Sequence, residues 1–360
     1  MNYRPLGKTG KMLSVIGFGG TQWFNEDAAG NIQLAIELGI NYFETAHIYC
    51  NNQSEIILGK GIKGRRDKVF ISTKSHAKHD FTSTASGVRT AIDEALKRMD
   101  VDKIDFYQMW GVNDQGTFDV VMSKDGPLEG AKKARQEGLI DHIGITSHDT
   151  SENIIKYIET GEFECLTVHY NMLNQEKQRV ISKAHEFGLG VIIMNPLAGG
   201  MLVPPPQEIK RQLYSMAYPT AELGLRFVIS NPSVTCAISG MGSVHEIKQN
   251  ASVGNNVSSL TEEELRKIKE IIMQFESLGP IFCNHCGYCR PCSQDIDIPR
   301  ILKLLNYYKV YGMKDWPFKQ YQIESKKANR CSECSQCLPR CPQKLDIIKL
   351  LKETHELFGS

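Results

Sequence analysis

Short apolar runs rich in β-branched residues alternate with longer amphipathic segments from residue 13 to about residue 240. Each amphipathic segment ends near a glycine or in a short turn, as helix C-termini prefer. Eight strands alternating with helices over about 250 residues predict an α/β fold, a (β/α)8 TIM barrel. A doubly wound sheet is the alternative, but no GxGxxG motif opens the first strand–helix turn. The expected strands are Leu13–Gly17, Asn41–Thr45, Val69–Thr73, Ile104–Met109, His142–Thr146, Cys165–His169, Gly190–Met194 and Val234–Ile238.

In such a barrel, chemistry takes place on the loops that follow the C-terminal ends of the strands. These loops therefore hold the candidate site residues. They are Glu44–Tyr49, Lys74–His76, Trp110–Asn113, Ser147–His148, Asn171, Pro196–Gly200 and Gly240–Ser243.

The last quarter of the chain carries eight cysteines in two runs, CNHCGYCRPC at 283–292 and CSECSQCLPRCP at 331–342. Three cysteines at i, i+3 and i+6 let one loop enclose a compact inorganic core, so the pattern predicts two [4Fe–4S] clusters. Zinc is the alternative, but a four-cysteine zinc site normally takes two pairs from separated knuckles. A disulfide framework is disfavoured, because the start MNYRPLGKTG does not resemble a signal peptide.

In two-cluster ferredoxins the fourth cysteine of each run ligates the other cluster. By this analogy one cluster would take Cys283, Cys286, Cys289 and Cys341, and the other Cys331, Cys334, Cys337 and Cys292. The first run departs from the pattern, because two residues and not three separate Cys289 from Cys292. The remaining cysteines are interpreted as small buried apolar residues, namely Cys50, Cys165 and Cys236.

Composition limits the class of protein. The 360 residues include 42 Lys and Arg against 41 Asp and Glu, which gives no sign of a nucleic-acid surface. Since no apolar stretch approaches the length of a membrane span, we expect a soluble, cytoplasmic protein with no membrane association.

The amphipathic segments near the cysteines define the second domain. Ile298, Ile301, Leu302 and Leu305 recur at helical spacing between the two cysteine runs, and LDIIKLLKETHELFG follows the second run. These patterns predict a small, mainly helical dicluster ferredoxin-like domain. Thr261 and Glu264 form a capping-box pattern ahead of it. We expect the barrel to cover 1–278 and the ferredoxin-like domain 279–360.

Four segments carry a family resemblance: GINYFETAHIYCNNQSEIILGKGI, VFISTKS, NPLAGGML and LRFVISNPSVTCAISGM. They resemble, in this order, strand regions of the aldo-keto reductases, and the likeness covers roughly residues 3–275. With its cysteine-rich tail, the chain resembles the branch of that family that has a C-terminal dicluster ferredoxin domain. The resemblance implies an oxidoreductase that acts on a small carbonyl, an alcohol or a related organic molecule.

The resemblance also implies a catalytic set. Aldo-keto reductases use a tyrosine as general acid with a lysine and an aspartate, and a histidine orients the carbonyl. Tyr49 and Lys74 match the tyrosine and lysine, and a phenol with an ordinary pKa of about 10 needs such a cation nearby. Glu44 replaces the aspartate and Trp110 the histidine. An indole N–H can donate one hydrogen bond but cannot titrate, so Trp110 either steers a carbonyl or simply fills the barrel mouth.

The nicotinamide site departs further from the family. Met194 stands where the family has an aromatic residue that stacks on the nicotinamide. Thr167 stands where the family has a glutamine for the carboxamide, and Ser147 stands for an asparagine. Gly240 and Glu246 stand where Lys and Arg would clamp the 2′-phosphate of NADPH. A carboxylate repels a phosphate, so NADPH is disfavoured, and NADH and a flavin stay as alternatives. Backbone amides of the 240–242 loop could still cradle an anion. The candidate cofactor-binding residues are Thr146, Ser147, Asn171, Pro196, Leu197, Gly240, Met241, Gly242 and Asn250.

Two functional hypotheses follow. In the first, the barrel oxidises or reduces the organic substrate while the clusters relay electrons, with a ferredoxin or another redox protein as partner. In the second, the barrel has lost nicotinamide-dependent ketone reduction and the chain is an electron-transfer or partner-docking protein. Clusters pass single electrons and nicotinamide passes a hydride, so joining the two normally requires a converter such as flavin.

Four histidines lie near the site loops, namely His47, His76, His79 and His148. No role is assigned to them, although His148 directly follows the fifth strand.

Overall fold

The computed structural model describes residues 1–24, 27–78, 80–172, 174–198, 220–256, 260–277, 283, 288–309, 314–341 and 343–359. The chain divides into two compact units. The first comprises residues 1–196 and 224–259, and the second comprises residues 197–223 and 260–360.

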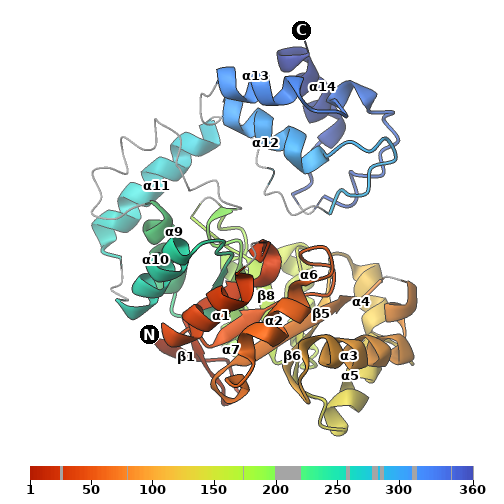
Figure 1. Cartoon of the computed structure of the whole chain (residues 1–360), viewed down its shortest axis with the longest axis vertical. Coiled ribbons are helices and arrows are strands. Elements are labelled where there is room, and N and C mark those ends of the chain that lie inside the picture. The colour runs from red at the N-terminus through yellow and green to blue at the C-terminus, as the bar shows by residue number, and fades with distance from the viewer. Residues whose placement is uncertain are drawn as a thin grey trace. The chain divides into compact units, whose positions relative to one another are not determined.

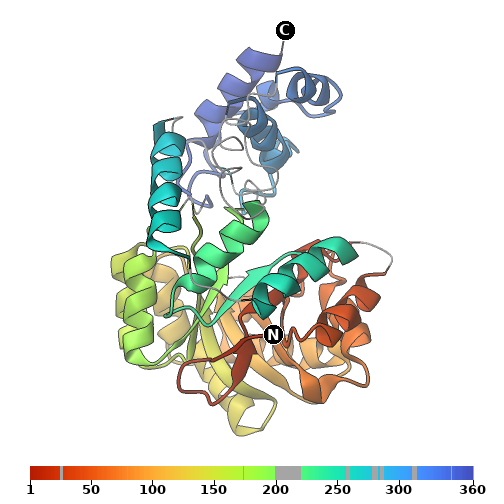
Figure 2. The same ribbon diagram turned by 90° about the vertical axis from the view of Figure 1, so that its left-hand side faces the viewer.

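The first unit is a closed barrel of eight parallel strands in the order β10-β3-β4-β5-β6-β7-β8-β9, which confirms the expected fold. In Figure 1 and Figure 2 the strands lie inside a layer of helices. The barrel strands are β3 (Ile16–Gly19), β4 (Tyr42–Glu44), β5 (Phe70–His76), β6 (Ile104–Trp110), β7 (Ile140–Thr146), β8 (Cys165–His169), β9 (Gly190–Met194) and β10 (Cys236–Ser239).

The expected first strand, Leu13–Gly17, is the largest departure from the predicted elements. It divides between β2 (Met12–Ser14), which pairs antiparallel with β1 (Tyr3–Pro5), and the barrel strand β3. The side chain of Asn41 accepts a hydrogen bond from Ser14 N at 2.7 Å and donates one to Met12 O at 2.9 Å. These bonds hold β2 outside the barrel.

The β1–β2 hairpin covers the N-terminal end of the barrel. Leu6 and Leu13 are fully buried and pack with interior residues such as Tyr42, Phe106 and Cys165. Gly190, the first residue of β9, has no side chain, and a Cβ there would lie 2.2 Å from Leu6 Cδ1. Because this end is filled by apolar side chains, any site inside the barrel opens at the C-terminal ends of the strands.

Several helices of the first unit have recognisable caps at one end. For example, Thr84 accepts a hydrogen bond from Gly87 N at the start of α3, and Gly188 ends α7 with a left-handed conformation. The helices are α1 (Ala28–Glu37), α2 (Ser54–Ile62), α3 (Ala85–Met99), α4 (Gln115–Met122), α5 (Pro127–Gln136), α6 (Ser151–Glu159), α7 (Gln178–Phe187), α9 (Thr220–Ser230), whose first residues belong to the second unit, and α10 (Val244–Asn255).

The regular secondary structure in the described part of the second unit is helical, as predicted. Thr261 and Glu264 form the expected capping box at the start of α11, with Thr261 N donating to Glu264 Oε2 at 2.7 Å and Glu264 N to Thr261 Oγ1 at 3.2 Å. Its helices are α11 (Glu262–Ser277), α12 (Ile298–Lys309), α13 (Asp315–Gln322) and α14 (Ile347–Phe358).

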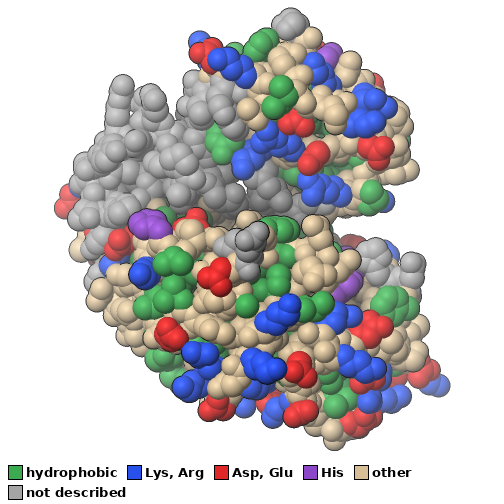
Figure 3. Space-filling model, in the orientation of Figure 1, with side chains coloured by type: hydrophobic (Ala, Val, Ile, Leu, Met, Phe, Trp, Pro, Cys, Tyr) green, Lys and Arg blue, Asp and Glu red, His purple; other side chains and the backbone are tan. Residues whose placement is uncertain are grey.

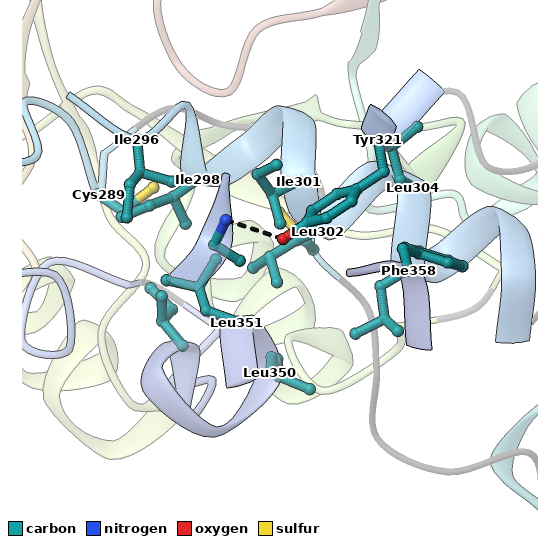
Figure 4. Packing of buried hydrophobic residues seen from close by; sticks show 14 residues of the cluster. Cys289, Ile296, Ile298, Ile301, Leu302, Leu304, Tyr321, Leu350, Leu351 and Phe358 are labelled. Carbon is teal, nitrogen blue, oxygen red and sulfur yellow. Dashed lines mark hydrogen bonds between the residues drawn. The ribbon is translucent and has the colours of Figure 1, made fainter. Parts of the chain in front are cut away.

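One apolar cluster holds this unit together (Figure 4). Ile298, Ile301, Leu302 and Leu305 of α12 are buried in it, at the spacing that predicted this helix. The hydroxyl of the buried Tyr321 accepts a hydrogen bond from Ala328 N at 3.0 Å, which ties the segment before the second cysteine run to the same core. No helix within the described ranges is both long enough and apolar enough to cross a bilayer.

Candidate active site and cluster cysteines

A buried ion pair lies at the C-terminal ends of two neighbouring strands. Glu44 is the last residue of β4 and Lys74 lies on β5, and their side chains form a salt bridge. Lys74 Nζ also donates to Thr45 O at 3.0 Å. The two residues are only 7% and 4% exposed, so neither charge has bulk water to stabilise it. Burial lowers the pKa of Lys74 well below its ordinary value, while the adjacent Glu44 carboxylate favours the protonated amine.

Two aromatic rings surround this ammonium group. Lys74 Nζ lies 4.6 Å from the ring centroid of Tyr49 and 5.6 Å from that of Trp110. The two rings meet edge to face, with centroids 6.0 Å apart. The structure therefore brings together all four predicted catalytic residues. Tyr49 is partly exposed, whereas Trp110 is buried.

A histidine ring lies next to Trp110 at the barrel rim. His76 ends β5 opposite Trp110 in the strand register, and the ring centroids are 5.6 Å apart. Its Nδ1 accepts a hydrogen bond from Lys78 N at 3.3 Å. Gly111 has a φ of +74°, and a Cβ there would lie 2.6 Å from His76 Nε2, so only glycine leaves room for this ring. His76 thus packs against the rim backbone. His79 lies outside the described residues.

The four polar side chains among the nine predicted cofactor-binding residues hydrogen-bond to the protein itself. Ser147 Oγ donates to Val112 O, and Asn171 Nδ2 donates to Asn195 O at 3.1 Å. Thr146 Oγ1 accepts from Gly111 N at 3.3 Å, and Asn250 Nδ2 donates to Ser239 Oγ at 3.0 Å. Pro196 and Leu197 follow β9 after one intervening residue.

Thr167, which stands where the family has a glutamine, also hydrogen-bonds within the protein. Its Oγ1 donates to Gln108 Oε1 at 2.7 Å, and Gln108 Nε2 donates to Ser72 Oγ at 2.9 Å. This polar chain crosses the barrel interior from β8 to β5, and the hydroxyl of Thr167 is buried within it.

The 240–242 loop meets a carboxylate of its own chain. Glu246 Oε2 accepts hydrogen bonds from Gly242 N at 2.7 Å and from Ser243 N at 3.0 Å, as part of a capping box that begins α10. Met241 is 1% exposed. A phosphate at this loop would therefore compete with Glu246 for the backbone amides, which adds a physical reason for disfavouring NADPH. The S-x-x-E pattern of a capping box is visible in the sequence at Ser243–Glu246 and could have revealed this bond.

Two buried histidines stack where β7 and β8 end. The rings of His148 and His169 have centroids 5.5 Å apart and an interplanar angle of 16°. Burial is the main cause that lowers the pKa of His148 to about 3 and that of His169 to about 4, and the nearby Lys177 ammonium lowers both further. Both rings are therefore neutral at pH 7. No sequence motif marks His169, because only the parallel pairing of β7 and β8 places it beside His148.

In the second unit, four thiols of the predicted second ligand set lie near one another. Burial, and then the neighbouring Cys331, Cys334 and Cys292, raise the pKa of the Cys337 thiol. Ser293, which follows Cys292, places its Oγ 3.6 Å from Cys334 Sγ. A soft thiolate set of this kind suits an iron–sulfur cluster. Within the described ranges, no three His, Cys, Asp or Glu side chains are grouped to hold a single metal ion.

The other predicted ligand set is partly visible. Cys283 and Cys289 are buried in the apolar cluster of Figure 4, and Cys341 packs against it. Cys286 lies outside the described residues. Cys50, Cys165 and Cys236 are buried in the first unit.

Comparison with known protein families assigns both parts of the chain. Residues 15–273 match the model of the aldo/keto reductase family. The chain belongs to the aldo-keto reductase family. Residues 282–346 of this aldo-keto reductase match a 4Fe-4S dicluster domain. The chain therefore combines a barrel of oxidoreductase type with an iron–sulfur domain.

Similar proteins match about three quarters of the chain. L-galactose dehydrogenase from Arabidopsis thaliana is 27% identical over 307 residues, which cover 76% of this chain and 95% of that protein. The uncharacterized oxidoreductase YqkF of Bacillus subtilis is 26% identical and covers 75% of this chain and 96% of its own length. The solved structure of aldo-keto reductase AKR11C1 from Bacillus halodurans, in its holo form, has a TM-score of 0.67 and 26% identity, covering 75% of this chain and 96% of that one.

Proposed function

We propose that this aldo-keto reductase is an iron–sulfur oxidoreductase that interconverts a small carbonyl compound and its alcohol, with electrons relayed by two [4Fe–4S] clusters. The observation that carries the proposal is the buried Lys74–Glu44 pair packed against Tyr49 and Trp110. This group lies at the C-terminal end of the barrel, where sites of this fold are found. A small-molecule substrate and a ferredoxin or similar redox partner follow from the two domains.

In the proposed reduction, Tyr49 donates its phenolic proton to the carbonyl oxygen. The ammonium of Lys74, 4.6 Å from the Tyr49 ring centroid, stabilises the phenolate that remains. The adjacent Glu44 carboxylate favours the charged form of Lys74 and so opposes the effect of burial. The edge-to-face contact between the Tyr49 and Trp110 rings fixes the orientation of the phenol. Conversion of a carbonyl to an alcohol takes two electrons and two protons, and Tyr49 accounts for one proton while solvent supplies the other.

The clusters would be held by the eight cysteines in the crossed arrangement. Cys331, Cys334, Cys337 and Cys292 would hold one cluster, and Cys283, Cys286, Cys289 and Cys341 the other. The proximity of Cys292 to the second run supports this arrangement. When bound, the clusters supply one-electron transfer. The proposed domain division is 1–278 and 279–360.

A ligand substitution tests the arrangement. Cys292→Ala is expected to lower the iron content of the anaerobically purified protein by about half, because it removes one ligand of one cluster. Cys236→Ala is the matched control, since that thiol is buried in the barrel interior. Iron and sulfide are measured per chain. Full iron content in Cys292→Ala would show that Cys292 is not a ligand.

A second candidate function is electron transfer without nicotinamide-dependent chemistry. It is supported by the hydrogen bond that Glu246 accepts from the 240–242 loop. The side chains of Ser147 and Thr167 also donate their hydrogen bonds to other residues of the protein. In either function NADPH is disfavoured, and NADH or a flavin are the alternatives for delivering an electron pair.

Reductant choice tests how electrons enter. The anaerobic holoprotein is titrated with NADPH, NADH and reduced methyl viologen, a one-electron donor, while the visible absorbance of the clusters is recorded. We expect methyl viologen to bleach the clusters and NADPH to leave them unchanged. Bleaching by NADPH at stoichiometric amounts would contradict the assignment of Glu246 as a barrier to the 2′-phosphate.

A further inference from the structure

The two predicted ligand sets differ in their exposure to solvent. Cys334 is exposed, and so are its neighbours from Ser332 to Gln336. By contrast, Cys283 and Cys289 are only 9% and 8% exposed and lie in the apolar cluster of Figure 4. The second cysteine run therefore presents one ligand at the surface of the unit, whereas the first run has two ligands in its core.

The unit around this exposed ligand is basic. Residues 279–360 contain 13 Lys and Arg against 8 Asp and Glu, while residues 1–278 contain 29 against 33. Figure 3 shows Lys and Arg side chains spread over the face of this unit that it draws. Such an imbalance within one chain favours an anionic partner at the C-terminal unit.

Two arginines next to the cysteine loops supply cations that the protein does not itself neutralise. Arg330 directly precedes Cys331, and Arg340 directly precedes Cys341; both are exposed. Arg340 Nη1 donates to Pro291 O at 3.3 Å, which holds this guanidinium beside the loop that carries Cys292. Across the part of the chain that the structure describes, neither arginine has a carboxylate within salt-bridge distance.

The other nearby charges largely cancel in pairs. Glu333, beside Cys334, bonds to Lys352 at 2.9 Å, and Arg290 bonds to Asp297 at 2.6 Å. Asp346 accepts a hydrogen bond from Lys349 N at the start of α14. The exposed Asp295 opposes the two arginines, and the exposed Lys344 adds to them.

We propose that the surface formed by Arg330, Arg340 and the exposed Cys334 loop is the docking site of an acidic one-electron carrier protein. This inference rests on the proposed electron-relay function and names the surface and the charge of the partner. Electron transfer between proteins requires close approach, and such encounters use small interfaces. Rim charges then govern the rate of association and its dependence on salt. One electron passes from the reduced carrier to the oxidised protein in each encounter.

Charge reversal on this surface tests the proposal. The anaerobic holoprotein is mixed with an acidic plant-type [2Fe–2S] ferredoxin, and binding is measured by titration while cluster reduction is followed by stopped flow. The double variant Arg330→Glu/Arg340→Glu should weaken binding and slow reduction by about tenfold or more, and added salt should slow the wild type toward the variant. Equal iron content in both proteins shows that the clusters are intact.

A matched variant separates a local surface from net charge. Lys314→Glu/Lys319→Glu makes the same change in charge at two exposed positions at α13 and should alter binding by less than about threefold. Equal loss in both double variants, or equally tight binding of the basic carrier cytochrome c, would overturn the proposal. Binding is measured without a carbonyl compound. Loss of docking in the arginine variant therefore supports the surface even if the barrel fails to turn over carbonyls.

Discussion

Tyr49→Phe is expected to lower carbonyl-dependent turnover by about 10²–10⁴-fold, because it removes the proposed proton donor and leaves the ring in place. The phenyl ring can still pack edge to face on Trp110 and under the Lys74 ammonium, so folding and cluster content should not change. Turnover is measured anaerobically with reduced methyl viologen as electron source and a small aldehyde as acceptor.

A second hydroxyl deletion provides the control. Tyr3 donates a hydrogen bond to Gly39 O at the exposed hairpin end of the barrel, remote from the C-terminal loops. Tyr3→Phe makes the same chemical change and should leave turnover near that of the wild type. If Tyr49→Phe retained turnover within a factor of about three, Tyr49 would not be the general acid.

Lys74→Met is expected to destabilise the barrel by about 3–5 kcal/mol, because Glu44 would be left buried without its cation. The carboxylate is 7% exposed, and water cannot replace the lost partner without rearrangement. The measurement is the free energy of unfolding from urea denaturation, followed by the fluorescence of the buried Trp23 and Trp110.

The double variant Glu44→Gln/Lys74→Met separates pairing from packing. It removes both buried charges and should recover part of the stability lost in Lys74→Met. Unfolding free energies of Lys74→Met and wild type within about 1 kcal/mol would show that the pair does not hold a buried charge. Lys74→Met should also lose turnover, because the phenolate of Tyr49 would have no cation nearby.

Local patterns predicted the barrel and the helical tail. Seven expected strands each overlap one barrel strand, because apolar runs and turn residues are short-range signals. The first expected strand spans β2 and β3, since the bend between them depends on Asn41, which comes after it in the sequence. The proximity of four side chains at the barrel mouth was also predicted, because parallel strands of a barrel bring the loops at their C-terminal ends together. These side chains are Glu44, Tyr49, Lys74 and Trp110.

Longer-range features could not be predicted in the same way. The stacking of His148 on His169 depends on the pairing of two strands, and neither residue has a motif of its own. The chain from Thr167 through Gln108 to Ser72 depends on packing across the barrel. Glu246 is different, because its capping box is a local pattern and its bonds to the 240–242 loop could have been predicted.

In the proposed function, one chain couples one-electron chemistry at its cysteine domain to carbonyl chemistry at its barrel. The most direct test is oxidation of reduced methyl viologen by the anaerobic holoprotein, with and without a panel of small aldehydes and ketones and with no nicotinamide added. We expect dye oxidation that requires a carbonyl compound, yields the alcohol, and consumes two equivalents of reduced dye per alcohol formed. Dye oxidation with no alcohol formed, or alcohol formation that occurs only when NADPH is supplied, would contradict it.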